Sequence, residues 1–176
     1  MATVSLLLLR HGIAEERQEP GPGVRPDRER PLTERGRQRT AAVVRRLLEL
    51  DLHCDQLLSS PLVRALQTAQ IAREEGLCAA LAIAAELSPD ADPIPLLGEW
   101  LAVDGPLAAG GRLGLVGHEP DLSALAARLC GAPPGAFCLK KAGVALLELP
   151  APRSVGEQPL MGSACLRLLL SPACLI

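Results

Sequence analysis

The feature that most constrains the fold is a short apolar run near the start of the chain that ends in a basic pair. Residues 4–9 are almost continuously apolar, and Arg10, His11 and Gly12 follow directly. A strand that is apolar at successive positions is typical of a parallel sheet covered on both faces. The run is too short and too soon interrupted for a membrane span or a signal peptide. We therefore expect a buried strand in a cytoplasmic protein without a membrane partner.

Apolar runs and helical patterns alternate along most of the chain. Thr33 is the expected N-cap of a first helix, and Ser60 that of a second helix with Pro61 in its first turn. The expected strands are 4–9, 55–58, 81–87, 112–116, 144–149 and 165–170, and the expected helices are 33–50, 60–76, 96–103 and 121–130. We expect the last two strands to be antiparallel. This order predicts a three-layer α/β/α sandwich with a mainly parallel central sheet, formed by one domain over residues 1–176.

Residues 15–31 interrupt this pattern with a loop rich in Pro, Gly and Arg. So many helix and strand breakers predict no regular element there. Between Glu15 and Arg30 the loop carries four arginines and five carboxylates, so it is no basic patch. It lies just beyond the first expected strand, where open α/β sheets bind ligands. The loop is therefore either a solvated segment or a docking edge for a partner protein.

The composition excludes several classes of function. Lys and Arg number 18 and Asp and Glu number 20, which gives a net charge of −2, and the chain has one Phe, one Trp and no Tyr. A near-neutral chain without aromatic stacking platforms gives no reason to expect a nucleic-acid partner. The six cysteines show no C-x-x-C spacing, so we expect them to be reduced and no metal to be bound. His53 has no basic neighbour and is expected at the surface.

Basic side chains follow three of the expected strands. Arg10 and His11 follow the first, Arg64 lies in the first turn of the helix after the second, and His118 follows the strand at 112–116. The carboxyl ends of parallel strands lie at one edge of the sheet, so we expect these four side chains to form one pocket. Guanidinium groups and helix N-termini bind phosphate, and a neutral imidazole can attack phosphorus. The pattern predicts phosphoryl chemistry with a protein nucleophile.

Three motifs at these strand ends resemble the histidine phosphatase superfamily, which has the phosphoglycerate-mutase-like fold. They are LRHG at 9–12, SPLVRALQTA at 60–69 and VGHEP at 116–120. Three further segments are similar to the SixA-type phosphohistidine phosphatases within it. These are RPLT at 30–33 with Gly36, ELSP at 86–89 with the DP pair at 92–93, and SP at 171–172.

The resemblance implies a phosphatase that removes phosphate from phosphohistidine on a phosphocarrier or phosphorelay protein, without a metal or organic cofactor. It implies that His11 is the phosphorylated nucleophile. It also implies that Arg10, Arg64 and His118 hold the phosphoryl group.

The chain departs from the larger members of that superfamily, which carry a carboxylic acid in an insertion between the second Arg and the second His. Here Arg64 and His118 are only 54 positions apart. Glu86 is the candidate general acid, ahead of Glu15, Glu119 and Asp90. An imidazole leaves phosphorus more readily than an alkoxide does, so phosphohistidine needs less acid assistance. A phosphatase of small phosphate monoesters, such as sugar or nucleotide phosphates, and a non-catalytic phosphate-binding adaptor are the alternatives.

Overall fold

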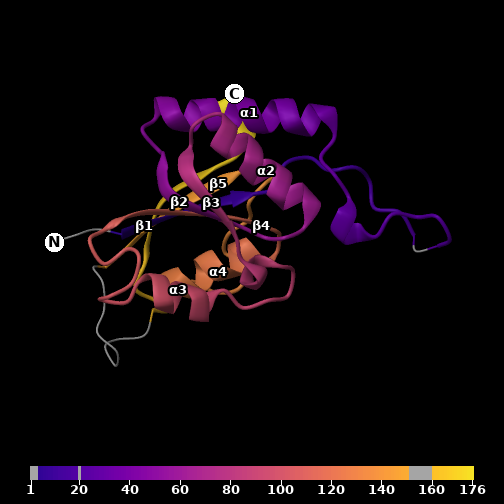
Figure 1. The fold of residues 1–176 in the computed structure, drawn as a ribbon. Coiled ribbons are helices and arrows are strands. Elements are labelled where there is room, and N and C mark those ends of the chain that lie inside the picture. Colours follow the sequence, from indigo (N-terminus) through magenta and orange to yellow (C-terminus); the bar gives the residue numbers. More distant parts are fainter. Residues whose placement is uncertain (1–3, 20, 151–159) are drawn as a thin grey trace.

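A computed structural model describes residues 4–19, 21–150 and 160–176 of the chain. Strands and helices alternate along most of it, as the apolar pattern predicts, and lie in layers (Figure 1). The strands are β1 (Val4–Arg10), β2 (Cys54–Ser59), β3 (Cys78–Ile83), β4 (Gly111–Gly117), β5 (Val144–Leu149) and β6 (Cys165–Leu170). The helices are α1 (Glu34–Glu49), α2 (Val63–Glu74), α3 (Ile94–Trp100), α4 (Asp121–Cys130) and α5 (Pro172–Leu175), with 3₁₀ turns η1 (Asp27–Glu29) and η2 (Ala85–Leu87).

The six strands form one sheet in the order β3-β2-β4-β1-β5-β6. The strands β3, β2, β4 and β1 are parallel to one another, whereas β5 pairs antiparallel with β1 and with β6. The predicted α/β fold with a mainly parallel sheet is confirmed, and so is the antiparallel pairing of the two late strands. The parallel strands β1, β2 and β4 therefore end at the same edge of the sheet.

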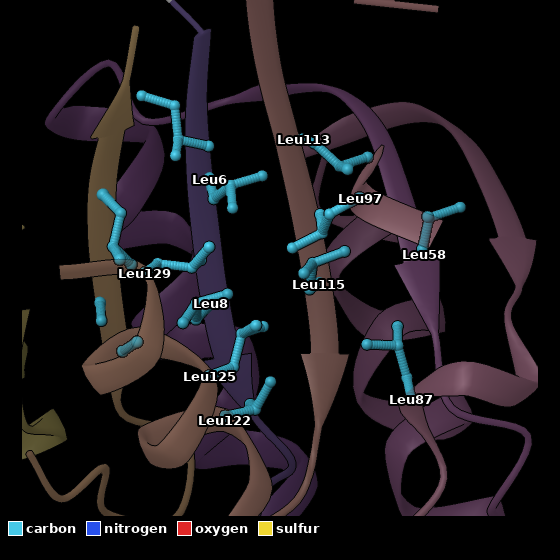
Figure 2. Packing of buried hydrophobic residues seen from close by; sticks show 14 of the residues in the cluster. Leu6, Leu8, Leu58, Leu87, Leu97, Leu113, Leu115, Leu122, Leu125 and Leu129 are labelled. Atoms are coloured by element: carbon cyan, nitrogen blue, oxygen red, sulfur yellow. The ribbon is translucent and has the colours of Figure 1, made fainter. Parts of the chain in front are cut away.

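The strand β1 is apolar at most positions because helices cover both faces of the sheet. In Figure 1, α1 and α2 lie on one side of the sheet and α3 and α4 on the other. Leu6 and Leu8 belong to the core on the α3 and α4 side, while Leu7 and Leu9 belong to the core under α1 and α2. Figure 2 shows leucines of α4 packed against Leu6 and Leu8. Successive residues of a strand point to opposite faces, so burial on both faces requires an unbroken apolar run.

The start of α1 is fixed by a side-chain cap and by a close backbone approach. The Gly36 amide donates a 2.9 Å hydrogen bond to the Thr33 hydroxyl, which confirms the predicted N-cap. A side chain at position 36 would clash with the main chain of Ile13, so only glycine fits there. This contact packs the start of α1 against the segment that follows β1, at the edge of the sheet where β1 ends.

Several predicted boundaries differ from the structure. The expected strand at 81–87 is instead β3 followed by the turn η2, and the expected helix at 96–103 is α3, which begins and ends earlier. The helix α2 begins at Val63 after Leu62, and Ser60 lies outside it. The loop 15–31 contains the turn η1, although no regular element was expected there. Much of the loop expected at 150–162 lies outside the described residues.

Candidate active site

The carboxyl ends of β1 and β4 bring two histidines together. The two strands are parallel neighbours with Arg10 paired to Gly117, and the His11 amide donates a 3.0 Å hydrogen bond to the Gly117 carbonyl. The imidazoles of His11 and His118 lie with their ring centroids 5.2 Å apart. They are only 6% and 3% exposed. Residues separated by more than a hundred positions thus share one buried pocket.

The main chain fixes the orientation and the protonation of His11. Its Nδ1 lies 2.7 Å from the carbonyl oxygen of Gly12, which can only accept, so Nδ1 carries the proton and donates it. The lone pair is then on Nε2. Burial lowers the pKa of His11 to about 3, an effect that outweighs the Gly12 hydrogen bond and is reinforced by His118, Arg64 and Arg10. The imidazole is therefore neutral at physiological pH, as a nucleophile must be.

The imidazole of His118 is oriented by a serine. Its Nε2 lies 2.8 Å from the hydroxyl of Ser60, and that hydroxyl accepts a 3.3 Å hydrogen bond from the Leu62 amide. We assign the hydroxyl proton to the contact with Nε2, which leaves the ring proton of His118 on Nδ1, the same tautomer as in His11. Burial, together with the positive charge of Arg64, lowers the pKa of His118 to about 4. The buried Nδ1 has no hydrogen-bond partner among the described residues.

The two arginines each use part of the guanidinium group for anchoring. Arg64, in the first turn of α2, donates from Nη1 to the Asp27 carbonyl at 2.8 Å and pairs through Nη2 with the Asp27 carboxylate at 3.2 Å. Arg10 donates from Nη1 to the Leu139 carbonyl at 2.8 Å. The buried Nε of each arginine has no hydrogen-bond partner among the described residues. Both positive charges act on the His11 and His118 rings.

Three buried N–H groups around the two rings therefore lack an acceptor. They are the Nε groups of Arg10 and Arg64 and the Nδ1 group of His118. A buried donor without a partner costs on the order of 1–3 kcal/mol, so such donors are usually kept for a ligand. Cationic donors near an imidazole lone pair suit a phosphoryl group, which offers three oxygens and an electrophilic phosphorus. The four side chains expected to form one pocket do lie together.

Thr68 ties the nucleophile segment to α2. Its hydroxyl donates to the Arg64 carbonyl at 2.8 Å and accepts from the Gly12 amide at 3.0 Å. A side chain at position 12 would clash with the hydroxyl of Thr40 on α1, so the backbone passes between α1 and α2 only as glycine. The glycine after the histidine thus allows the approach, and Thr68 holds it in place.

The loop 15–31 contributes a residue that the sequence did not single out. Asp27 pairs with Arg64 and also accepts a 3.1 Å hydrogen bond from Nε of Arg30. Partial burial opposes its ionisation, but the charges of Arg64 and Arg30 outweigh burial and lower the pKa of the Asp27 carboxyl. Arg30 also donates to the Glu15 carbonyl at 2.7 Å, which ties the two ends of the loop together. The only sequence signal was the position of Asp27 just before the RPLT segment.

Each of the four candidate general acids is either exposed or already hydrogen-bonded to another residue. Glu86 in η2 is exposed and has no hydrogen bond or ion pair with any described residue. Glu119 accepts hydrogen bonds from the amide and hydroxyl of Ser123 and so caps α4. Glu15 pairs with Arg25 at an exposed position. Asp90 is exposed and has a left-handed backbone.

The described residues outside this cluster show no metal-binding group and no membrane-spanning helix. The side chain of His53 is 61% exposed and lies 3.2 Å from Asp51. Within residues 4–19, 21–150 and 160–176, no three His, Cys, Asp or Glu side chains are grouped so as to hold a metal ion. The described helices include none with the length and apolarity needed to cross a membrane.

Comparison with known proteins gives one family match within the first half of the chain and one relative that covers most of it. The family model of the histidine phosphatase superfamily (branch 1) matches residues 6–88. An uncharacterized protein from Picosynechococcus sp. is 37% identical over 163 residues, which cover 85% of this chain and 88% of that protein.

Two solved structures share the fold. The first is the protein histidine phosphatase SixA in complex with tungstate, 23% identical, with a TM-score of 0.76 over 98% of this chain and 100% of the other. The second is a protein from Nakamurella multipartitia assigned as a phosphohistidine phosphatase SixA, 25% identical, with a TM-score of 0.69 over 97% and 96% of the two chains.

Proposed function

This chain belongs to the histidine phosphatase superfamily, and from that premise we propose that it removes the phosphoryl group from phosphohistidine on a protein. In this proposal His11 carries the phosphoryl group as a covalent intermediate. Arg10, Arg64 and His118 bind the phosphoryl oxygens. The SixA phosphatases among the structures that share the fold support this choice of substrate.

One observation carries the proposal. A neutral imidazole with its lone pair on Nε2 lies in the same buried pocket as three N–H donors that no described residue accepts from. The nucleophile must be unprotonated to attack phosphorus, and the oxygens must be held by donors that need no rearrangement. Burial keeps the His11 imidazole neutral, and the Gly12 carbonyl leaves its lone pair on Nε2. The anchored guanidinium groups of Arg10 and Arg64 provide the second condition.

The proposed reaction has two steps. The Nε2 lone pair of His11 forms a P–N bond while the P–N bond of the donor breaks, and the departing imidazole takes up a proton. Water then attacks the phosphorus, the bond to Nε2 breaks, and inorganic phosphate leaves. The Nδ1 hydrogen bond to Gly12 stabilises the positive charge that His11 acquires as it is phosphorylated.

Among the described residues no carboxylate contacts the His11 or His118 imidazole by a hydrogen bond or an ion pair, which favours a P–N substrate over an ester. Glu86 is the remaining candidate for that role, and it is exposed and unpaired among the described residues. An alkoxide leaving group needs a proton in the transition state, whereas an imidazole leaves more readily. A phosphatase of small phosphate esters is the second candidate, and it would require Glu86 or water to supply that proton.

Detection of the phosphoenzyme tests the proposal. We expect intact-mass and ³¹P measurements to show one phosphoryl group on the protein after incubation with a phosphohistidine protein, and none in His11→Ala. Turnover by His11→Ala should fall by about 10³-fold or more, as for loss of other covalent nucleophiles. His53→Ala is the matched control, because His53 is exposed and outside the pocket.

A panel of donors separates the alternatives. A higher kcat/KM on sugar or nucleotide phosphates than on a phosphohistidine protein would contradict the proposed substrate. Phosphate binding without any turnover or phosphoenzyme would instead indicate a non-catalytic adaptor.

A further inference from the structure

A groove of about 500 Å³ lies beside the catalytic pocket. Its wall residues come from four separate segments of the sequence: Arg10, Ile13, Arg39, Lys140, Lys141, Ser171, Pro172 and Ala173. Ile13 and Ala173 supply apolar surface, and the long cationic side chains supply the charge. No acidic side chain of the described segments lines the groove.

The positive charge of the groove is not neutralised within the described part of the chain. Arg39, Lys140 and Lys141 have no carboxylate partner within 4 Å among the described residues. The two lysines are the only ones in a chain of net charge −2, and both are exposed. The groove therefore carries a local excess of unpaired positive charge on a slightly acidic protein.

A second hollow, under the loop 15–31, shows the contrast. It measures about 660 Å³ and is lined by three arginines and three carboxylates, which are Arg17, Arg25, Arg30, Glu15, Glu16 and Asp27. Its three arginines all pair with carboxylates of the loop, Arg17 and Arg30 with Asp27 and Arg25 with Glu15. This hollow therefore offers no unpaired positive charge to a partner, whereas the groove beside Arg10 does.

The lysine segment is fastened to the nucleophile strand. The Leu139 carbonyl accepts from Arg10, and the Ala142 amide donates to the His11 carbonyl at 3.1 Å. The Arg10 amide donates to the Gly143 carbonyl at 3.1 Å. Arg10 lines the groove, and its positive charge also acts on the His11 imidazole. A chain lying in the groove would therefore be held at a fixed place relative to His11.

We propose that this groove docks an acidic segment of the phosphohistidine-bearing protein, next to its phosphorylated histidine. The inference rests on the proposed function and names the surface that selects the partner. Exposed lysine and arginine side chains attract carboxylates at a distance and raise the association rate. The apolar surface of Ile13 and Ala173 suits the side chains between those carboxylates. A small phosphorylated compound would fill the pocket at His11 and leave the groove empty.

Charge reversal in the groove tests the inference with two donors. The variant Lys140→Glu/Lys141→Glu is compared with wild type on a phosphohistidine protein whose phosphorylated helix has acidic neighbours, and on phosphoramidate. We expect kcat/KM on the protein to fall by about tenfold or more, since charge steering changes association rates by that order. The rate on phosphoramidate should stay unchanged. Wild-type kcat/KM on the protein should also fall as salt is raised, and the variant should lose most of that dependence.

A matched variant controls for net charge. Arg46→Glu/Arg73→Glu changes the charge equally in the last turns of α1 and α2, which lie at the sheet edge opposite the pocket. We expect this variant to keep wild-type kcat/KM on both donors, and circular dichroism verifies the fold of both variants.

The outcomes separate this inference from the proposed function. Equal losses on both donors, or no loss on either, would overturn the docking groove while the phosphatase activity stands. If wild type releases phosphate from neither donor, the proposed function itself fails and the groove inference falls with it.

Discussion

The two buried imidazoles should make the stability of the fold depend on pH just below neutrality. Burial lowers the pKa of His11 to about 3 and that of His118 to about 4. In the unfolded chain a histidine titrates near 6.5. As the pH falls below that value, the unfolded chain binds protons that the native pocket does not accept. The free energy of unfolding therefore decreases on acidification, down to the native pKa values.

The magnitude follows from proton linkage. Between pH 7 and pH 5.5, each neutral buried histidine lowers the free energy of unfolding by about 1.2 kcal/mol, so the pair lowers it by about 2.5 kcal/mol. A typical domain is stable by about 5–15 kcal/mol, so this loss is easily measured. The pocket that keeps the nucleophile neutral thus reduces stability in mild acid.

Urea unfolding at several values between pH 7 and pH 5.5 measures the effect. We expect the double variant His11→Asn/His118→Asn to lose most of the pH dependence, whatever its stability at pH 7. His53→Asn is the control, because that side chain is exposed and lies outside the pocket. A free energy of unfolding that is constant from pH 7 to 5.5, or a pH dependence that persists in the double variant, would refute the argument that both rings are held neutral.

Three further substitutions test the supports of the pocket. Ser60→Ala removes the hydroxyl that holds the second imidazole, and steady-state kinetics should show kcat/KM about tenfold lower, the equivalent of one buried hydrogen bond. Asp27→Ala leaves the buried Arg64 without its carboxylate, and urea unfolding should show a loss of about 1–3 kcal/mol, which inorganic phosphate partly restores. Gly36→Ala forces a clash with a backbone carbonyl beyond β1 and should cost about 2 kcal/mol in the same assay. Gly98→Ala, which has open space around it, should cost nothing measurable.

The sequence by itself determined the sheet and the place of the site. The nearly continuous apolar run at 4–9 predicts burial on both faces, and this holds for β1. Because parallel strands end at one edge of the sheet, the sequence predicts that the motifs following three of the strands lie close together. The cap of α1 by Thr33 was also readable, since a serine or threonine three residues before a helical amide is a local pattern. These features depend on the periodicity of apolar residues and on residues close together in the sequence, so the sequence alone predicts them.

Only the tertiary structure decided which groups complete the pocket. Ser60 looked like a helix cap, but its hydroxyl bonds to a histidine 58 residues away. Asp27 was one of nine charges in a loop until its contact with Arg64, 37 residues on, distinguished it. The docking groove likewise joins Arg39 and the two lysines, which are remote from it in the sequence. A polar side chain can form hydrogen bonds of similar energy with several different groups. Which of these bonds it forms depends on which groups the fold brings within reach.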